Sequence, residues 1–459
     1  MRAGVLLIVR QAFLVSLSLI GVLVTMRILG PTHYGAYVTA LGIHQFVVTL
    51  GQLGTGVYLL HSVEDVDELD FHVASSFLLV VGIAGGIIDG LVLPRMGSYF
   101  VGIANAMPIL SLLACSLPIQ LVTTPAIARL ERDLNYGSVV LVEAVTQTLY
   151  YAIGVPLALI GWDSWSLAIA YVVQQGSACI LFHLVGRWLP HPTWDAASIK
   201  KMLLYTIGYS ASSWIWQARS LVNSVLVGGL LGVEAVGFVN LAIRLVEILS
   251  LIRNATWRLS LVAIARLKND KARLLNAISD GMEVQVLAMG IPLVIFISAD
   301  EQLFNIMFGP RWAPALSLFP FIAVAILTNT MFTLHFSSFY IFKRNWDVAV
   351  FHILNLVLFG TGAYFLIWEF GLIGYGIAEL IALPSYVVLD LKMRRLIGAP
   401  YYSRVAPWYI CLVLVLLLRP LGFWVCFLTF APLAWRGNRQ RIRFYSRQLL
   451  QVILPSNLI

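Results

Sequence analysis

The sequence predicts an all-α polytopic membrane protein with about 14 transmembrane helices, built as two parallel six-helix repeats around a central cavity plus two C-terminal helices. Three observations lead to this: an apolar composition, long uncharged runs and an internal repeat. The chain of 459 residues is 60% hydrophobic and only 11% charged, whereas a soluble domain carries about 25% charged residues. Most of the chain therefore cannot face water.

The uncharged runs predict the individual helices, because about 18 apolar residues cross a bilayer and a helix satisfies its own backbone hydrogen bonds. The first run has no small-residue cleavage site, so we interpret it as an uncleaved span rather than a signal peptide. The last two are short and are divided near Pro420. The predicted spans are 5–28, 35–60, 72–93, 99–124, 137–160, 165–186, 204–230, 236–260, 281–299, 314–341, 347–368, 372–391, 405–419 and 421–435.

The basic residues predict the orientation of these spans. With the N-terminus inside, 23 of the 30 Lys and Arg residues fall on the cytoplasmic side. The other side receives four, which are Arg27, Arg95, Arg311 and Arg419. By the positive-inside rule both termini are cytoplasmic. The net charge of +8 is then a matter of topology and does not indicate a nucleic-acid partner. The acidic segment 64–70 does not follow this pattern.

A repeated turn indicates that the chain is duplicated. The stretch "RILGPTHYGAYVTA" (27–40) matches "GLLGVEAVGFVNLA" (229–242) at a constant offset of 202 residues (232 − 30). Weaker matches follow in the same order at similar offsets. Because six is even, two six-helix copies enter the membrane from the same side, which is a parallel repeat. We expect an N-terminal bundle at 1–190, a C-terminal bundle at 191–400, and two extra helices with a basic cytoplasmic tail at 401–459.

Charged and polar residues inside the spans are the candidate site residues. A charge at mid-bilayer costs roughly 2.5–3.5 kcal/mol on insertion scales, so it usually faces a cavity or a partner. The candidates for a substrate-binding cavity are Arg10, Arg219, Arg244, His44 and Gln45. The candidates for ion coupling are Asp89, Glu143, Glu247, Glu283 and Glu379.

Simpler interpretations remain open for several of these residues. Arg10 lies within two turns of the cytoplasmic end and can snorkel to the interface. Arg244 and Glu247 are three residues apart on one helix and can neutralise each other. Each carboxylate taken alone can also be a packed or interfacial polar residue.

Signals of catalysis or of a cofactor are poor. The four cysteines are far apart inside apolar runs, so they predict neither disulfides nor a metal site. The chain has no phosphate-binding loop, and we expect no cofactor and no ATP drive. The tripeptide "DVD" (65–67) is similar to the DxD of sugar transferases. Membrane-bound transferases need this motif on the outer face, whereas here it is predicted to be cytoplasmic.

Four stretches carry a family resemblance: "RILGPTHYGAYVTA", "IARLERDLNYGSVVLVEAV", "LLGVEAVGFVNLAIRL" and "NIMFGPRWAPALSLF". The chain resembles the polysaccharide-exporter branch of the multidrug/oligosaccharidyl-lipid/polysaccharide flippase superfamily, the Wzx-type flippases of O-antigen and exopolysaccharide units. The likeness extends from the first span to about the twelfth. It implies two six-helix bundles around a cavity whose recurring feature is cationic residues, a part that Arg10 and Arg219 match by kind and place rather than by motif.

The resemblance implies a flippase for undecaprenyl-pyrophosphate-linked oligosaccharides in the bacterial cytoplasmic (inner) membrane, working by alternating access and not as an enzyme. The implied partners are this lipid-linked substrate, membrane lipids and, as further candidates, the polysaccharide polymerase and chain-length or export proteins. Two alternatives remain. A cation-coupled multidrug antiporter on the same fold predicts an acidic and aromatic cavity. A membrane glycan-processing enzyme predicts catalytic carboxylates on outer loops.

Overall fold

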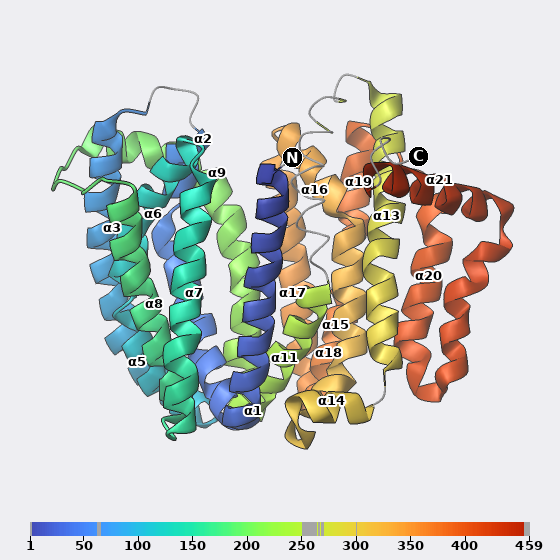
Figure 1. Ribbon diagram of the computed structural model, residues 1–459, viewed down its shortest axis with the longest axis horizontal. Coiled ribbons are helices and arrows are strands. Elements are labelled where there is room, and N and C mark those ends of the chain that lie inside the picture. Colours follow the sequence, from blue (N-terminus) through green and yellow to red (C-terminus); the bar gives the residue numbers. More distant parts are fainter. Residues whose placement is uncertain are drawn as a thin grey trace. The chain divides into compact units, whose positions relative to one another are not determined.

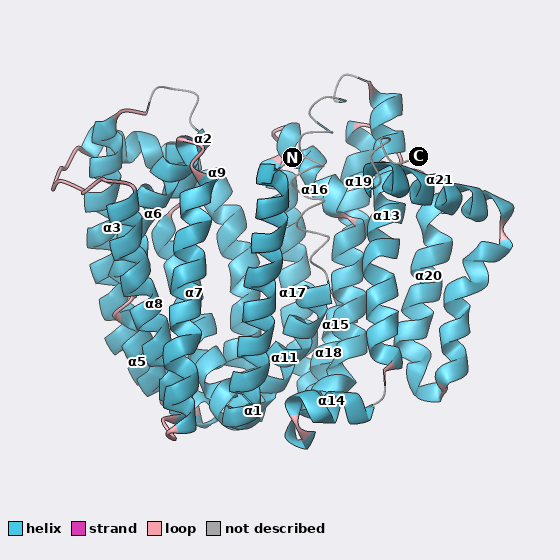
Figure 2. Cartoon of the chain, viewed as in Figure 1, coloured by secondary structure: helices cyan, strands magenta, loops and turns pink. Residues whose placement is uncertain are grey.

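The computed structural model describes residues 2–61, 66–249, 264, 267, 270–299 and 301–453. Within these residues the chain consists of helices joined by turns and loops and contains no strand (Figures 1 and 2). Eight of the described helices are long and apolar enough to cross a membrane, or nine if one bent pair is counted as a span. The all-α membrane fold is thereby confirmed, whereas the number of 14 spans stays a prediction.

The chain forms two compact units, which we describe separately. The first unit comprises Met1–Leu241, Gln302–Ser317 and His352–Ala378. The division of the chain into three parts at residues 190 and 400 stays a prediction. The helices up to residue 249 are α1 (Arg2–Gln52), α2 (Thr55–His61), α3 (Glu68–Ile87), η1 (Ile88–Val92), α4 (Leu93–Gly97), η2 (Val101–Ala106), α5 (Met107–Ala114), α6 (Leu117–Arg132), α7 (Tyr136–Leu159), α8 (Asp163–Val185), α9 (Ala196–Leu221), η3 (Val222–Val227), α10 (Gly228–Leu231) and α11 (Val233–Leu249).

The repeated turn has the same backbone conformation in both copies. Gly30, at the kink of α1, has φ 69°, and Gly232, between α10 and α11, has φ 87°. Both values lie in the left-handed region that only glycine adopts without strain. The glycine is thus required at this point of the turn, which explains why both copies retain it.

The second glycine of the repeat serves close packing. A Cβ atom on Gly35 would lie 1.9 Å from the Val233 carbonyl oxygen and 3.2 Å from the Gly237 nitrogen. A Cβ atom on Gly237 would lie 2.6 Å from the Pro31 carbonyl oxygen and 3.3 Å from the Cα of Gly35. The two equivalent glycines therefore lie against each other, where α1 and α11 approach too closely for any side chain.

The "FGPRW" segment (308–312) packs a later part of the chain against α1. It begins with the last residue of α14 (Glu301–Phe308), continues through Gly309 at φ 93°, and ends with η4, formed by Pro310–Trp312. Trp312 is only 1% exposed, donates its indole N–H to the Met26 carbonyl at 3.2 Å, and meets the Tyr34 ring edge-on at 5.8 Å. The indole is thus a packing element of the first unit.

The acidic segment near residue 67 has a structural role in its described part. Asp67 precedes α3 as its N-cap, and the Asp70 carboxylate accepts the Asp67 N–H at 3.2 Å. Glu68 pairs with Arg129 of α6 at 2.8 Å. Acidic residues in the first turn also oppose the positive end of the helix dipole. Residues 62–65 lie outside the described part of the chain.

The second unit comprises Ala242–Glu301, Leu318–Phe351 and Glu379–Ile459. Helix α13 is unbroken from Lys271 to Ser298 and is capped by Asp270. From residue 271 on, the remaining helices are α13 (Lys271–Ser298), α15 (Pro314–Met331), α16 (Thr333–Ile341), α17 (Asn345–Phe370), α18 (Leu372–Ile381), α19 (Ser385–Leu396), α20 (Tyr402–Leu418), η5 (Arg419–Leu421), η6 (Phe423–Ala434) and α21 (Arg436–Ile453).

The predicted break near Pro420 is confirmed. Helix α20 ends at Leu418, the short η5 contains Pro420, and Gly422 reverses the chain at φ 137°. The twelve apolar residues of η6 then return alongside α20 as a 3₁₀ helix. At about 2.0 Å rise per residue this segment spans more of the hydrocarbon than an α-helix of equal length.

Candidate functional site

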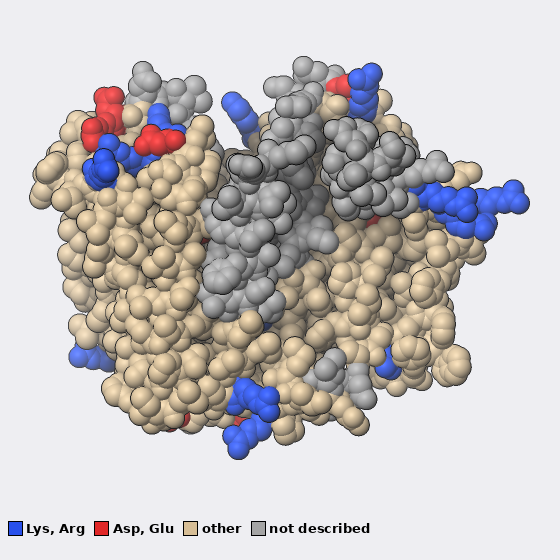
Figure 3. All heavy atoms as spheres, in the orientation of Figure 1, with Lys and Arg blue, Asp and Glu red and all other residues tan. Residues whose placement is uncertain are grey.

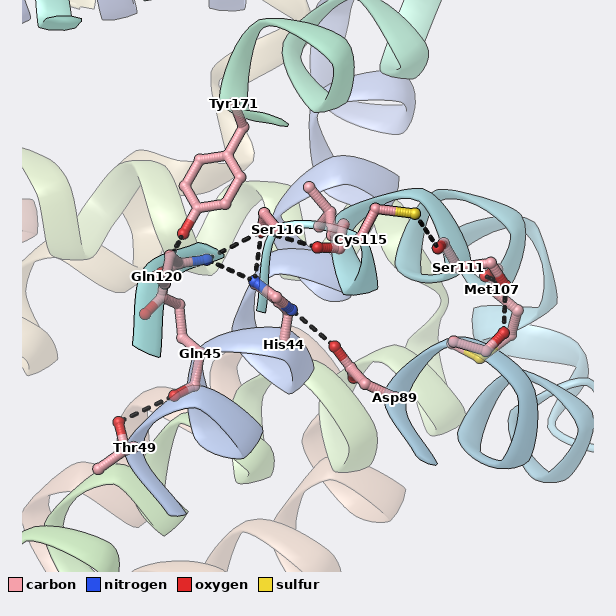
Figure 4. A network of polar contacts seen from close by, with 12 residues as sticks. His44, Gln45, Thr49, Asp89, Met107, Ser111, Cys115, Ser116, Gln120 and Tyr171 are labelled. Carbon is pink, nitrogen blue, oxygen red and sulfur yellow. Dashed lines mark hydrogen bonds and ion pairs between the residues drawn. The ribbon is translucent and has the colours of Figure 1, made fainter. Parts of the chain in front are cut away.

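A buried contact between a histidine and an aspartate lies in the first unit (Figure 4). The Nδ1 atom of His44 on α1 lies 2.6 Å from Oδ2 of Asp89 on η1, and both side chains have no exposed surface. The sequence suggested His44 for substrate and Asp89 for ions. The structure places them in direct contact, so they form one site.

Four further polar side chains extend the pair into a network. Oγ of Ser116, the residue before α6, and Nε2 of Gln120 on α6 lie 3.1 and 3.0 Å from Nε2 of His44. The Tyr171 hydroxyl donates to Gln120 Oε1 at 3.2 Å and accepts from Gln45 Nε2 at 2.6 Å. Four helical segments therefore meet at this network, and Gln45, a predicted cavity residue, belongs to it (Figure 4).

The backbone at Asp89 is unusual, because residues 88–92 form a π-helical segment inside the long helix. Such π-bulges occur frequently at functional sites. The hydroxyl of Ser111 donates to the Gly90 carbonyl at 2.9 Å and so satisfies one irregular backbone group. Oδ1 of Asp89 has no hydrogen-bond partner among the described residues.

Both partners of this contact are ionisable side chains. A carboxylate and an imidazole in contact form either an ion pair or a neutral hydrogen-bonded pair. Oδ1 of Asp89 remains available for a ligand, since the contact with His44 is through Oδ2. Within the described residues, no group of three or more His, Cys, Asp or Glu could hold a metal ion.

Arg219 forms a second polar group in the first unit. It lies on α9, just before the π-helical η3, and donates to Oδ1 of Asn355 on α17 at 2.5 Å. Its guanidinium carbon lies 4.2 Å above the ring centre of Phe359. The ring of Trp216, one helical turn earlier, meets His352 edge-on at 5.2 Å. Sequence reasoning identified Arg219 and missed Asn355 and Phe359, which are 136 and 140 residues away along the chain.

The remaining candidates lie outside the His44–Asp89 network and the contacts of Arg219 described above. Arg244 and Glu247 lie 3.6 Å apart with half-exposed side chains, which is the mutual pairing that their spacing allowed. Glu143 is exposed on α7, and Glu379 on α18 is buried. Arg10 belongs to α1, but its side chain lies outside the described residues. The roles of these residues stay predictions.

Glu283 is fully buried and joins α13 to the C-terminal helix. Its carboxylate accepts hydrogen bonds from Arg441 Nε at 2.9 and 3.1 Å, from the Trp408 indole at 3.1 Å and from the Tyr445 hydroxyl at 3.1 Å. Burial, and secondly the charge of Glu283, raise the pKa of Tyr445, so the phenol stays a donor. We refer to the contacts of Glu283 with Arg441 and Tyr445 as the α21 latch.

The described helices that are long and apolar enough to cross a bilayer define a polytopic membrane protein. The chain belongs to the family described as "Polysaccharide biosynthesis protein", which it matches over residues 24–317. The resemblance to the polysaccharide-exporter branch of the flippase superfamily is thereby confirmed.

One curated relative is the succinoglycan biosynthesis transport protein ExoT of Rhizobium meliloti (strain 1021), which is 21% identical over 301 residues. The alignment covers 65% of this chain and 60% of that protein.

Two solved structures show the same fold. The lipid II flippase MurJ in an inward closed conformation superposes with a TM-score of 0.73 at 12% identity, covering 94% of this chain and 99% of that chain. An inward-facing multidrug resistance MATE family transporter superposes with a TM-score of 0.63 at 14% identity, covering 83% and 94%. The predicted flippase-like fold is thereby confirmed, and at these identities the likeness concerns the fold alone.

Proposed function

We propose that this chain is a flippase that translocates undecaprenyl-pyrophosphate-linked oligosaccharide repeat units across the cytoplasmic membrane by alternating access, for surface or exopolysaccharide biosynthesis. The family and the succinoglycan transport relative support this class of substrate. The proposal also includes cytoplasmic termini, and a polymerase and chain-length or export proteins as partners. It assigns a transporter and no catalytic step.

Arg219 carries the proposal. Guanidinium pairs bidentately with phosphate oxygens, whereas a lysine acts only as a point charge. Arg219 donates a hydrogen bond to the neutral amide of Asn355. The ring of Phe359 lies against the face of the guanidinium, so the charge stays close to an aromatic surface. This arrangement suits the pyrophosphate of a lipid-linked sugar.

The driving force has two proposed sources. An inside-negative membrane potential favours outward movement of negative charge by about 2.3 kcal/mol per charge per 100 mV. Counter-transport of a proton through the His44–Asp89 pair would add a second source, because protonation removes the ion pair. The potential alone moves the substrate in one direction, and the pair would make the movement dependent on the proton gradient.

A cation-coupled multidrug antiporter is the second candidate, and one observation favours it. The fully buried acid of the first unit, Asp89, is the kind of group that this reading predicts. The family and the succinoglycan transport relative favour the polysaccharide substrate instead.

Complementation tests the proposal. The gene is deleted in its host and restored as wild type, Arg219→Ala, or the control Arg95→Ala, which removes an exposed arginine from α4. We expect wild type and the control to restore surface polysaccharide. Arg219→Ala, expressed at the same level, should leave completed repeat units on their lipid carrier inside the cell.

Two other outcomes would contradict the flippase. If repeat units are never completed in the deletion strain, the chain acts in their assembly. If surface polysaccharide is unchanged and drug sensitivity rises, the antiporter takes the place of the flippase.

A further inference from the structure

The C-terminal helix α21 has an arginine stripe on one face. Arg436, Arg439 and Arg443 are exposed and follow each other at intervals of three and four residues, which places them on the same side of a helix. Arg447 continues this spacing in the sequence. The helix contains five arginines and no Asp or Glu between residues 436 and 453, so nothing on α21 itself compensates the charge.

The α21 latch fixes which way this stripe faces. Arg441 lies about 140° around the helix from Arg436, at 100° per residue, and is held by the buried carboxylate of Glu283. Tyr445 contacts the same carboxylate, and Asn438 donates to the Pro432 carbonyl at 2.9 Å. The face with these three residues is thus bound to the second unit, and the arginine stripe is directed away from it.

The depth of α21 relative to a membrane follows from its neighbours. The helix runs across the end of α20 and meets α13 at Glu283, and basic side chains gather at that edge in the space-filling view (Figures 1 and 3). Trp435, 64% exposed, separates the apolar η6 from Arg436. Exposed tryptophans concentrate at the membrane–water interface. The stripe therefore begins where the hydrocarbon ends, at the depth of the phospholipid headgroups.

We propose that the arginine stripe of α21 is a binding surface for anionic phospholipid headgroups. The occupant is the membrane surface itself, because charge complementarity and depth agree and guanidinium pairs with phosphate oxygens. A basic residue near an anionic bilayer surface strengthens association by about fivefold. This lipid contact is separate from the proposed transport of saccharides and from Arg219, and it would hold the second unit at a fixed depth in the leaflet.

The test uses the purified full-length protein in mixed micelles with equal phosphatidylglycerol and phosphatidylcholine. Native mass spectrometry counts the lipids of each kind that remain bound. The stripe variant carries Arg436→Gln, Arg439→Gln and Arg443→Gln. The matched control carries Arg187→Gln, Lys200→Gln and Arg395→Gln, which removes three exposed positive charges elsewhere. Because all six side chains are exposed, both variants should fold, which size-exclusion chromatography checks.

We expect wild type and the control to retain phosphatidylglycerol several-fold over phosphatidylcholine, and the stripe variant to lose this preference. Replacing the same three arginines by lysine should restore most of it. Equal preference in wild type and the stripe variant would overturn the proposal. An equal loss in the control would do so as well, because net charge alone would then account for the binding. Displacement of the lipid by millimolar inorganic pyrophosphate would also overturn it, since the stripe would then be a site for free anions.

Discussion

The buried His44–Asp89 pair allows a quantitative prediction. Asp89→Asn or His44→Gln alone removes one partner of an ion pair whose side chains are both completely buried. Leaving one buried charge without its partner costs about 3–5 kcal/mol, whereas joint replacement by neutral groups of similar volume is often close to neutral. The double variant should therefore be less destabilised than the two single effects added together, by about 3 kcal/mol.

Unfolding free energies of the four proteins, titrated with denaturing detergent in mixed micelles, give this coupling energy. The chain provides a matched control in His33 and Asp163, which lie 3.7 Å apart with half-exposed side chains. Exposed pairs contribute about 0–1 kcal/mol, so the same cycle on His33 and Asp163 should give little coupling. Additive effects for His44 and Asp89 would refute the charged state of the pair.

The transport role of the pair requires a separate measurement. In proteoliposomes with a lipid-linked saccharide and an imposed pH gradient, wild type should move the lipid faster with the gradient than without it. Asp89→Asn should fold and lose this acceleration, because an amide does not take up a proton. Equal acceleration in the variant would exclude Asp89 as the coupling group while leaving the flippase itself intact.

Three further predictions concern packing and the α21 latch. Gly35→Ala places a methyl group 1.9 Å from a backbone oxygen and should lower the free energy of unfolding by about 1–3 kcal/mol or more, which lowers the melting temperature. The control is Gly208→Ala, whose methyl group would have nothing within 4 Å and should not lower the melting temperature. Trp312→Phe loses one indole hydrogen bond and should cost about 1 kcal/mol of unfolding free energy. Glu283→Gln removes the counter-charge of Arg441, so trypsin should cut α21 faster than in wild type, and an unchanged rate would argue against the α21 latch.

The sequence was most informative where a local rule applies. Long runs of uncharged residues predicted the membrane-spanning helices. The repeated "LG" predicted a turn, and both Gly30 and Gly232 have positive φ in it. Pro420 marked the break between the last two apolar segments. Each of these features is decided within a few residues by hydrophobicity or backbone sterics, which the sequence displays directly.

The partners of the charged residues were not predictable in the same way. The repeat offered no partner for Asp89, whose contact is His44 on a neighbouring helix. The offset identifies equivalent positions and contains no information about which helices pack together. Likewise Glu283 meets Arg441, 158 residues later, and no spacing in the sequence indicates this. The helix that carries each polar residue was predictable, but its neighbour across the helix interface was not.

The contact between Gly35 and Gly237 joins two residues that occupy the same place in their respective copies. Equivalent residues touch each other in this way at a two-fold symmetry axis, as in an isologous dimer interface. In a homodimer any substitution at such a point would act on both sides at once. Here the two positions are encoded separately, and the space around them differs. The nearest backbone oxygen would be 1.9 Å from a Cβ on Gly35 and 2.6 Å from a Cβ on Gly237. Fusion into one chain thus allows each side of the axis to change independently.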